Sequence, residues 1–477
     1  MARERSAAGL AAEQPRGGET REGAQAIAAR LAEVLGEPLA DGVQQLSGGA
    51  SRATFAFATA THGRLVLQME RDAARAEERP GQAALLAAAA RASVPVARVV
   101  AHGCEDAVLG ASWIVMEEVP GTTDPGAILA GEGVPAPAEL IESIAATLAA
   151  VHRMPADQGL APRVDDPLAQ LRALHDRLGQ PHPTFELVFR ALGPDRAPAR
   201  RTLVHGDFRV GNLMVAPGGV SAVLDWELAH VGDPLEDLGW LCVPAWRFRR
   251  PDRPAAGLGT REQLAAAYER HAGVGVDLAA MRRWELAGTL RWGVICVLQA
   301  FTHPSGASHS VEHAVIGRRA CEVEWDLLEM LGDSEPAAAP QQPPPAPDRR
   351  PPPRASLHDR PTAVELLHAA RGALGEDVLP VLEGRRAFQL RVALRAIGMV
   401  ARELERADEH AALRAVALAR LGVADERELA ASIRSGALGG REREVRAGLR
   451  GLVRAKLEVA NPSYLEGGGT RNPKERR

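Results

Sequence analysis

Residues 203–215 read LVHGDFRVGNLMV, and residues 222–234 read AVLDWELAHVGDP. The apolar runs NLMVA and VSAVLDW lie on either side of a Pro-Gly-Gly turn, a pattern typical of a β-hairpin. Asp207 and Asn212 precede the first strand of this hairpin, and Asp225 ends the second. Because the turn brings the two strand ends together, one carboxylate is expected to face a substrate hydroxyl, while an amide and a second carboxylate share Mg²⁺.

The composition indicates a globular chain with no strong charge field. The 477 residues are 46% hydrophobic, and 57 basic and 61 acidic residues leave a net charge of -4. This length allows two or three domains, and the mixed charges offer no surface for nucleic acid or an anionic membrane. The sequence contains neither a membrane-spanning apolar run nor the apolar segment of a secretory signal. We therefore expect a cytoplasmic protein with no nucleic-acid partner and no membrane partner.

Cysteine and lysine usage narrows the chemistry further. Cys104, Cys242, Cys296 and Cys321 form no CxxC or Cys/His metal spacing, and we expect them to be reduced thiols in the core. No lysine precedes Lys456, so arginine supplies the basic charge of almost the whole chain.

The first part of the chain predicts a small antiparallel sheet. Residues 1–21 are polar and glycine-rich, and we expect a disordered tail there. Helical periodicity over 24–35 precedes the short apolar runs VQQL, ATFAFAT and RLVLQM, which are typical of strands. A helical stretch over 82–91 and a further strand, SWIVMEEV, follow. These elements predict an α+β lobe over residues 22–120.

The rest of the chain predicts helices, interrupted by one linker. Over 121–333, stretches such as LIESIAATLAAVHRM and MRRWELAGTLRWGVICVLQAF carry the helical period, and the hairpin is the only strand pair expected. Residues 334–356 are so rich in proline that they predict an extended linker. It precedes a separate all-helical domain expected over 357–467 and a disordered tail over 468–477.

The motif HGDFRVGN followed by LDWE resembles the catalytic loop and the metal-binding Asp of the aminoglycoside phosphotransferase and choline kinase-like family. These proteins are relatives of protein kinases, whose equivalent motifs are HRDxxxxN and DFG. The resemblance extends in order over about 25–330, through SGGAS as a phosphate-covering loop, MEEVPG as a hinge, and GDPLEDLGWL. It implies a two-lobed kinase-like fold over 22–333, with a small antiparallel-sheet N-lobe and a mainly helical C-lobe.

The resemblance also implies ATP and Mg²⁺ as cofactors and assigns roles to individual residues. Asp207 would accept the proton of the attacking hydroxyl, and His205 would order the loop. The implied Mg²⁺ ligands are Asn212 and Asp225. The implied nucleotide-binding residues are Ser47, Gly48, Gly49, Gln68, Glu117 and Val119. Asp233 and Asp237 would tie the loop to the next helix.

The sequence departs from this family at the site that anchors the phosphates. Gln68 stands where a cationic residue is expected, and Gln82 stands where its glutamate partner belongs. One interpretation is that Arg52 or Arg71 supplies the charge while the two glutamines form a hydrogen bond. With a shifted alignment, Glu77 or Glu78 would instead be the acidic partner on the helix. The remaining interpretation is a pseudokinase that binds nucleotide without turnover.

Two other classes of protein stay open. A metal-dependent hydrolase could use His205, Asp207, Asp225, His230 and Asp233, although this leaves the first lobe without a role. An interaction scaffold is the other alternative.

The predicted acceptor depends on a resemblance to a narrower group of kinase-like domains. WELAHVGDPLEDLGWL is similar to kinase-like domains found fused to or beside acyl-CoA dehydrogenases, which implies a small-molecule hydroxyl acceptor, with a hydroxyacyl-CoA first, and an acyl-CoA dehydrogenase partner. An aminoglycoside antibiotic is the alternative acceptor. The basic run WRFRRPDRP is either a solvated surface or a binding site for a phosphorylated or CoA-bearing acceptor. Arg385, Arg386, Arg391 and Arg395 of the C-terminal domain form either a solvated helix face or a docking surface.

Overall fold

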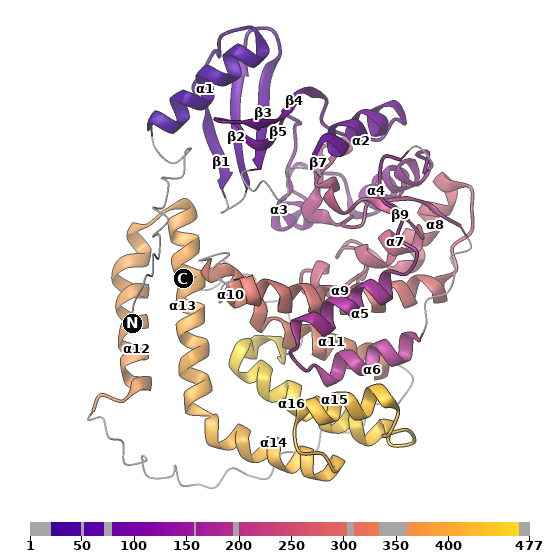
Figure 1. The fold of residues 1–477 in the computed structure, drawn as a ribbon, viewed down its shortest axis with the longest axis vertical. Helices are drawn as coiled ribbons and strands as arrows, with labels where there is room; N and C mark the ends of the chain where they lie inside the picture. The colour runs from indigo at the N-terminus through magenta and orange to yellow at the C-terminus, as the bar shows by residue number, and fades with distance from the viewer. Residues whose placement is uncertain are drawn as a thin grey trace, which may run out of the picture. The chain divides into compact units, whose positions relative to one another are not determined.

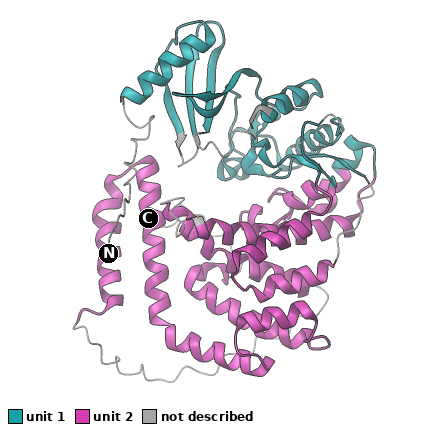
Figure 2. Ribbon diagram, in the orientation of Figure 1, with its two compact units in different colours: residues 1–163, 200–234, 267–274 teal, residues 164–199, 235–266, 275–477 magenta. Residues whose placement is uncertain are grey.

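The computed structural model of this chain describes residues 21–48, 52–70, 79–156, 159–193, 200–302, 310–332 and 360–466 (Figure 1). The chain divides into two compact units (Figure 2). The first consists of residues 1–163, 200–234 and 267–274, and the second of residues 164–199, 235–266 and 275–477. Arg21, the last residue of the expected N-terminal tail, instead begins a helix. The rest of the expected terminal tails and the proline-rich linker lie outside the described residues.

The first unit opens with helix α1 and a small antiparallel sheet, as the sequence predicts, and this sheet has five strands. The bounds are α1 (Arg21–Leu35), β1 (Gln44–Gly48), β2 (Arg52–Thr59), β3 (Gly63–Glu70), β4 (Val99–Asp106) and β5 (Gly110–Glu117). The strand order is β1-β2-β3-β5-β4. Alternation along β3 buries Leu65, Leu67 and Met69 in a core with Ile27 and Leu31 of α1, so Gln68 belongs to the opposite face of the sheet. Strand β4 was not predicted.

The remainder of the first unit carries the hairpin. Its elements are α2 (Arg79–Arg91), α3 (Pro125–Ala130), α4 (Pro137–His152), β6 (Thr202–Val204), η2 (Val210–Asn212), β7 (Leu213–Ala216), β8 (Gly219–Val223), η3 (Trp226–Leu228) and β9 (His230–Gly232). Strands β7 and β8 form the predicted hairpin, and β6 pairs with β9 around it. The amide of Val220 donates to Oγ of Ser143 at 2.9 Å, which fixes the hairpin on α4.

The second unit is helical throughout its described part. Its helices are α5 (Pro167–Leu178), α6 (Pro183–Leu192), α7 (Leu235–Leu241), η4 (Pro244–Trp246), α8 (Arg261–Ala272), α9 (Leu278–Thr302), α10 (Val311–Arg318), α11 (Ala320–Gly332), α12 (Ala363–Ala373), α13 (Gly384–Glu405), α14 (Ala407–Leu421), α15 (Glu426–Ser435) and α16 (Glu442–Ala460), with short turns η5 (Leu374–Val378), η6 (Leu379–Val381) and η7 (Pro462–Tyr464). The last residues of α8 belong to the first unit. Phe185, Leu290, Val294 and Leu327 pack in one core of α6, α9 and α11.

The helices after residue 360 confirm the predicted helical character of the C-terminal region. They do not pack only on one another, because Leu429, Ile433 and Leu449 share a core with Cys321 and Leu328 of α11. The domain boundaries expected from the sequence remain predictions.

Two further expectations concern the cysteines and the membrane. All four cysteines are free, and Cys242, Cys296 and Cys321 are buried as expected, but Cys104 is exposed because β4 lies at the edge of the sheet. None of the helices in the described ranges is long and apolar enough to cross a membrane.

Candidate active site

His205 fixes the loop that leaves strand β6. It is fully buried, and its ring lies edge-on to Trp226, with ring centroids 4.9 Å apart. Nε2 donates to the carbonyl of Leu224 at 2.9 Å, and Nδ1 accepts from the amide of Asp207 at 3.2 Å. Both ring nitrogens are therefore used by the backbone, and the ring links the loop to the far strand of the hairpin.

Asp207 lies two residues after His205 in the same loop. Its Oδ2 accepts a hydrogen bond from Nδ2 of Asn212 at 2.6 Å, and its Oδ1 accepts one from Nε of Arg209 at 3.1 Å. Nδ2 of Asn212 also donates to the backbone carbonyl of Asp207 at 3.0 Å. The Asp207 side chain keeps 15% of its surface exposed. The carboxylate is thus held in one orientation while part of it stays accessible to a reactant.

The hairpin register brings Asp225 to the same end of the hairpin as Asn212. Leu213 pairs with Val223, and the amide of Leu224 donates to the carbonyl of Asn212 at 2.8 Å. Asp225 is the next residue and adopts the left-handed region, with φ 60° and ψ 65°. Non-glycine residues rarely take this conformation, and it is often found at functional sites.

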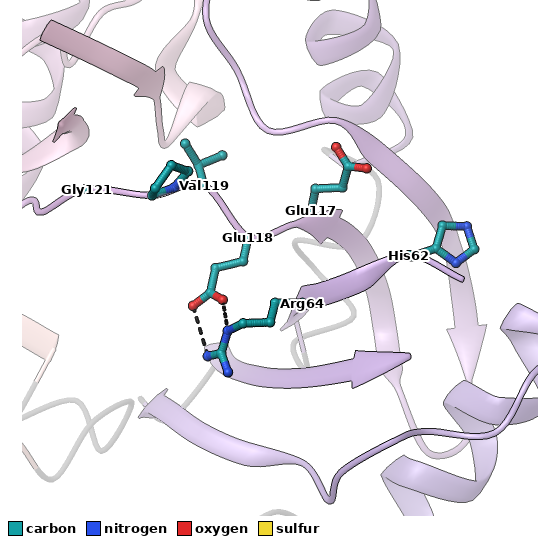
Figure 3. Close-up of a pocket in the computed structure, with 7 residues that line it drawn as sticks. His62, Arg64, Glu117, Glu118, Val119 and Gly121 are labelled. Atoms are coloured by element: carbon teal, nitrogen blue, oxygen red, sulfur yellow. Dashed lines mark hydrogen bonds and ion pairs between the residues drawn. The ribbon is translucent and has the colours of Figure 1, made fainter. Parts of the chain in front are cut away.

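A pocket lies at the end of the N-terminal sheet (Figure 3). It has a volume of about 510 Å³ and is lined by His62, Arg64, Glu117, Glu118, Val119, Pro120 and Gly121. Arg64 forms an ion pair with Glu118, drawn as dashed lines in Figure 3, and Arg98 forms one with Glu117. The Arg98 guanidinium lowers the pKa of Glu117, so this carboxyl is charged at neutral pH. Glu117 and Val119, both predicted from the sequence, lie in this pocket.

Hydrogen bonds fix the hinge segment that lines the pocket to the β7–β8 hairpin. Thr122 and Val215 exchange two backbone hydrogen bonds, each 2.9 Å long. Oγ of Ser221 donates to the carbonyl of Pro120 at 2.7 Å. Gly121 has φ +133°, and a Cβ added there would lie 2.5 Å from the carbonyl oxygen of Val215. The hinge and the loop of Asp207 are therefore parts of one connected structure.

The other residues expected around the nucleotide phosphates are only partly described. Ser47 and Gly48 end β1, whereas Gly49 and Arg71 lie outside the described residues. Gln68 on β3 is half-buried and pairs across the sheet with Thr54 and Ile114. Both glutamines are described, and no hydrogen bond joins Gln68 to Gln82. This corrects the suggested glutamine pair, since the two side chains lie on separate elements that do not bring their amides together.

The metal-hydrolase interpretation does not fit the geometry. Each ring nitrogen of His205 is engaged by the backbone, and Nδ1 of His230 bonds the carbonyl of Leu228 at 2.9 Å. Among the residues that the structure describes, the His/Cys/Asp/Glu cluster suited to a metal ion is His175, Asp176 and Glu186 on α5 and α6, outside this loop. Asp237 is buried on α7 in the second unit, so its expected tie to the loop remains a prediction.

Arg209 was not singled out from the sequence. The sequence feature that could have identified it is its place in HGDFRVGN, where it is the cationic residue two positions after Asp207. An added Cβ at Gly211 would lie 2.4 Å from Nη1 of Arg209, so the small residue leaves room for this guanidinium. The loop itself therefore carries a cation beside the Asp207 carboxylate.

Residues 42–274 match the sequence profile of the phosphotransferase enzyme family. This chain contains a phosphotransferase-family domain. A crystal structure of a protein from Ralstonia eutropha, provisionally named an aminoglycoside phosphotransferase, aligns with 65% of this chain and 98% of that protein at a TM-score of 0.50 and 23% identity. At that identity the likeness shows the fold alone, and it confirms the kinase-like fold expected for the phosphotransferase domain.

Curated relatives match shorter segments. Acyl-CoA dehydrogenase family member 10 of Mus musculus is 41% identical over 86 residues, which make up 16% of this chain and 8% of that protein. Acyl-CoA dehydrogenase family member 11 of Pongo abelii is 27% identical over 206 residues, which make up 39% of this chain and 26% of that protein. The matched segments thus span about a quarter or less of these relatives. Residues 380–464 match a domain of unknown function, DUF6285.

Proposed function

We propose that the phosphotransferase domain moves the γ-phosphate of ATP to a hydroxyl group of a small-molecule acceptor, with Mg²⁺ as cofactor. The observation that carries this proposal is the arrangement of the catalytic loop. Asp207 is held by Asn212 and Arg209, and the hairpin brings Asp225 to the same end. The family profile over residues 42–274 supports the reaction class.

Asn212 and Asp225 fit a magnesium ion. Since Nδ2 of Asn212 donates both of its hydrogen bonds to Asp207, Oδ1 is the atom of this side chain that can coordinate a cation. One amide oxygen and one carboxylate suit Mg²⁺, which takes its other ligands from phosphate oxygens and water. When bound there, the ion would neutralise charge on the phosphate oxygens.

Asp207 orients the acceptor hydroxyl and takes its proton as the oxygen attacks the γ-phosphorus. The bond from that phosphorus to the β,γ-bridging oxygen breaks, and ADP leaves with the electron pair. Arg209 holds Oδ1 of Asp207 and supplies positive charge close to the transferring group. This role offsets the glutamine at position 68, where the family places a cation.

The adenine is proposed to bind at the hinge. Backbone groups of Glu117 and Val119 line the 510 Å³ pocket, and their position relative to the loop is fixed by the hydrogen bonds between Thr122 and Val215. The phosphates would extend toward the β1–β2 turn, which includes Ser47, Gly48 and Gly49.

A hydroxyacyl-CoA is the acceptor we propose first, in the cytoplasm, with an acyl-CoA dehydrogenase as a partner. This rests on the names of the curated relatives, both of which are acyl-CoA dehydrogenase family members. An aminoglycoside is the second acceptor we propose, since the catalytic-loop motif resembles that of the aminoglycoside phosphotransferase family. A pseudokinase is the competing function, because Gln68 and Gln82 replace the usual ion pair.

Nucleotide titration with and without Mg²⁺, followed by turnover of ATP with each acceptor class, tests this function. The proposal predicts Mg²⁺-dependent ATP binding and turnover that Asp207→Asn abolishes without loss of binding. Binding without turnover in the wild-type protein would identify a pseudokinase. No binding would identify a scaffold.

A further inference from the structure

A second cavity lies in the C-terminal helical region, between α12 and α13. It has a volume of about 380 Å³ and is lined by His368, Arg371, Gly372, Gly375, Glu376 and Leu394. The two helices run side by side (Figure 1), and the chain between them passes through the π-helical turn η5. Such turns are rare and are often found at functional sites.

Two guanidinium groups converge beside this cavity. A Cβ added at Gly398 of α13 would lie 3.3 Å from Nη1 of Arg402 and 3.6 Å from Cζ of Arg371. Both groups therefore lie over one backbone position of α13, one from each helix. Nε of Arg402 donates to the carbonyl of Val459 on α16 at 2.8 Å, which holds this side chain in place.

Among the residues that the structure describes, no carboxylate forms an ion pair with either of these two cations. Glu405 is 3.5 Å from Nε2 of His368, and Glu376 lines the cavity without an ion pair to Arg371 or Arg402. In the described ranges, Arg371 has no acidic partner at all. The pKa of Arg402 is lowered, first by burial and then by the charge of Arg371, although the charge of Glu405 raises it in part. Like charges placed together repel, and an anion bound between them would offset that repulsion.

We propose that this cavity binds a phosphate group through Arg371 and Arg402. Guanidinium groups present several N–H donors in a fixed plane, which matches the oxygens of phosphate and favours two or more hydrogen bonds. The cavity exceeds the volume of one phosphate, and Leu394 gives it an apolar wall, so a phosphate attached to an organic group fits. Gly372 lines the cavity, and a Cβ added there would meet no atom within 4 Å, so a larger side chain has room at this position.

Calorimetric titration of the full chain tests this site, with inorganic phosphate, coenzyme A and dephospho-coenzyme A as probes. Arg371→Gln removes one ligand and is expected to weaken phosphate binding about tenfold, the loss of one charge-assisted contact. Gly372→Leu blocks the cavity while keeping both arginines, and it should abolish binding. Glu376→Gln removes an opposing charge and should strengthen binding. Arg386→Gln, at an exposed arginine of α13 that does not line the cavity, is the matched control.

The probes separate the sources of the phosphate. Tighter binding of coenzyme A than of dephospho-coenzyme A, lost in Arg371→Gln, identifies an organic phosphomonoester. If Arg371→Gln weakens the binding of inorganic phosphate but leaves the binding of coenzyme A and dephospho-coenzyme A unchanged, free phosphate is the ligand. Phosphate binding that is unchanged in both Arg371→Gln and Gly372→Leu, or absent from the wild-type chain, would overturn the proposal. Circular dichroism melts of each variant establish that it folds.

Discussion

At the scale of single residues, the proposed reaction depends on Asp207 and Arg209. Nε of Arg209 donates to Oδ1 of Asp207 at 3.1 Å, so the guanidinium positions the carboxylate. In the proposed reaction the same guanidinium also brings positive charge to the transferring phosphoryl group. The sequence singled out Asp207, Asn212 and Asp225, because their spacing in HGDFRVGN and LDWE matches the motifs of the family that the chain resembles. It could not show which side chains bond Asp207, since that depends on rotamers and on the left-handed backbone of Asp225.

Arg209→Gln is the corresponding test. We expect turnover to fall about 100-fold, the usual cost of losing one transition-state donor. Nucleotide affinity should change much less, because the adenine site at the hinge is untouched. Arg153→Gln is the control, since its guanidinium donates to the carbonyl of His271 at 2.8 Å and is exposed. Steady-state kinetics and nucleotide titration measure both effects, and a turnover number equal to that of the wild type would contradict the role of Arg209.

At the scale of elements, backbone hydrogen bonds between Thr122 and Val215 join the hinge to the hairpin. Periodicity predicted α1, β2, β3, α2, α4 and the hairpin, because each carries a clear apolar repeat. The three-residue strands β6 and β9 were not predicted, since so short a segment contains no periodic signal and its pairing is set by distant residues. Likewise, no local sequence pattern predicted that the hinge contacts β7.

Gly121→Ala tests this contact. The added methyl group would meet the carbonyl of Val215 at 2.5 Å, and the backbone at φ +133° disfavours any side chain. We expect a loss of about 2 kcal/mol in the free energy of unfolding. We also expect weaker nucleotide binding, because the hinge must shift.

Gly218→Ala, in the turn of the same hairpin, is the control for the hinge variant. A Cβ there meets no atom within 4 Å and φ is not positive. Equal stability and equal nucleotide affinity for the two alanine variants would refute a hinge held by β7.

At the scale of the whole molecule, the C-terminal helices share the core of α6 and α11. The proline-rich linker suggested a separate domain, and periodicity predicted amphipathic helices without naming the surface that covers them. That surface was not predictable, because an apolar face fits any other apolar face of suitable shape. Polar contacts then fix the arrangement: Nζ of Lys456 lies 2.8 Å from the buried carboxylate of Glu324, and the Arg434 guanidinium of α15 bonds the buried Glu186 of α6 at 2.6 Å.

Glu186→Gln tests how much the ion pair with Arg434 contributes to the free energy of unfolding. Glu186 is 1% exposed and also accepts a hydrogen bond from Nη1 of Arg172 at 2.5 Å. Its loss leaves the Arg172 guanidinium without this counterion and removes one of the two carboxylates that pair with Arg434, the other being Asp176 at 2.6 Å. We expect a loss on the order of 3 kcal/mol in the free energy of unfolding. Glu403→Gln breaks an exposed pair with Arg318 and should cost less than about 1 kcal/mol. Urea unfolding compares the two variants, and similar costs would argue against the buried pair.

Asp326 makes the stability of this region depend on pH. Burial raises its pKa to about 7, although the Tyr464 hydroxyl donates to its carboxyl group at 2.8 Å and lowers the pKa in part. In the unfolded chain this carboxyl loses its proton near pH ~4. The folded state therefore holds a proton that the unfolded state has lost, and the stability contributed by Asp326 is complete below about pH 4 and is lost as the pH rises to 7.

Asp326→Asn is the test of that dependence. The amide accepts the same hydrogen bond but does not titrate, so the variant should gain stability over the wild type by up to about 4 kcal/mol between pH 4 and 7. Unfolding free energies at several pH values within this window measure the difference. A difference that stays constant over the window would show that Asp326 does not titrate as described.

Transfer of a phosphoryl group by the Asp207 loop is the central claim, and mass spectrometry of the acceptor tests it most directly. The full chain is incubated with ATP, Mg²⁺ and a panel of hydroxyacyl-CoA and aminoglycoside acceptors, beside Asp207→Asn. The account predicts that an acceptor gains the mass of one phosphoryl group with the wild-type protein and that no gain occurs with the variant. The same gain with Asp207→Asn, or none with the wild type on any acceptor, would contradict it.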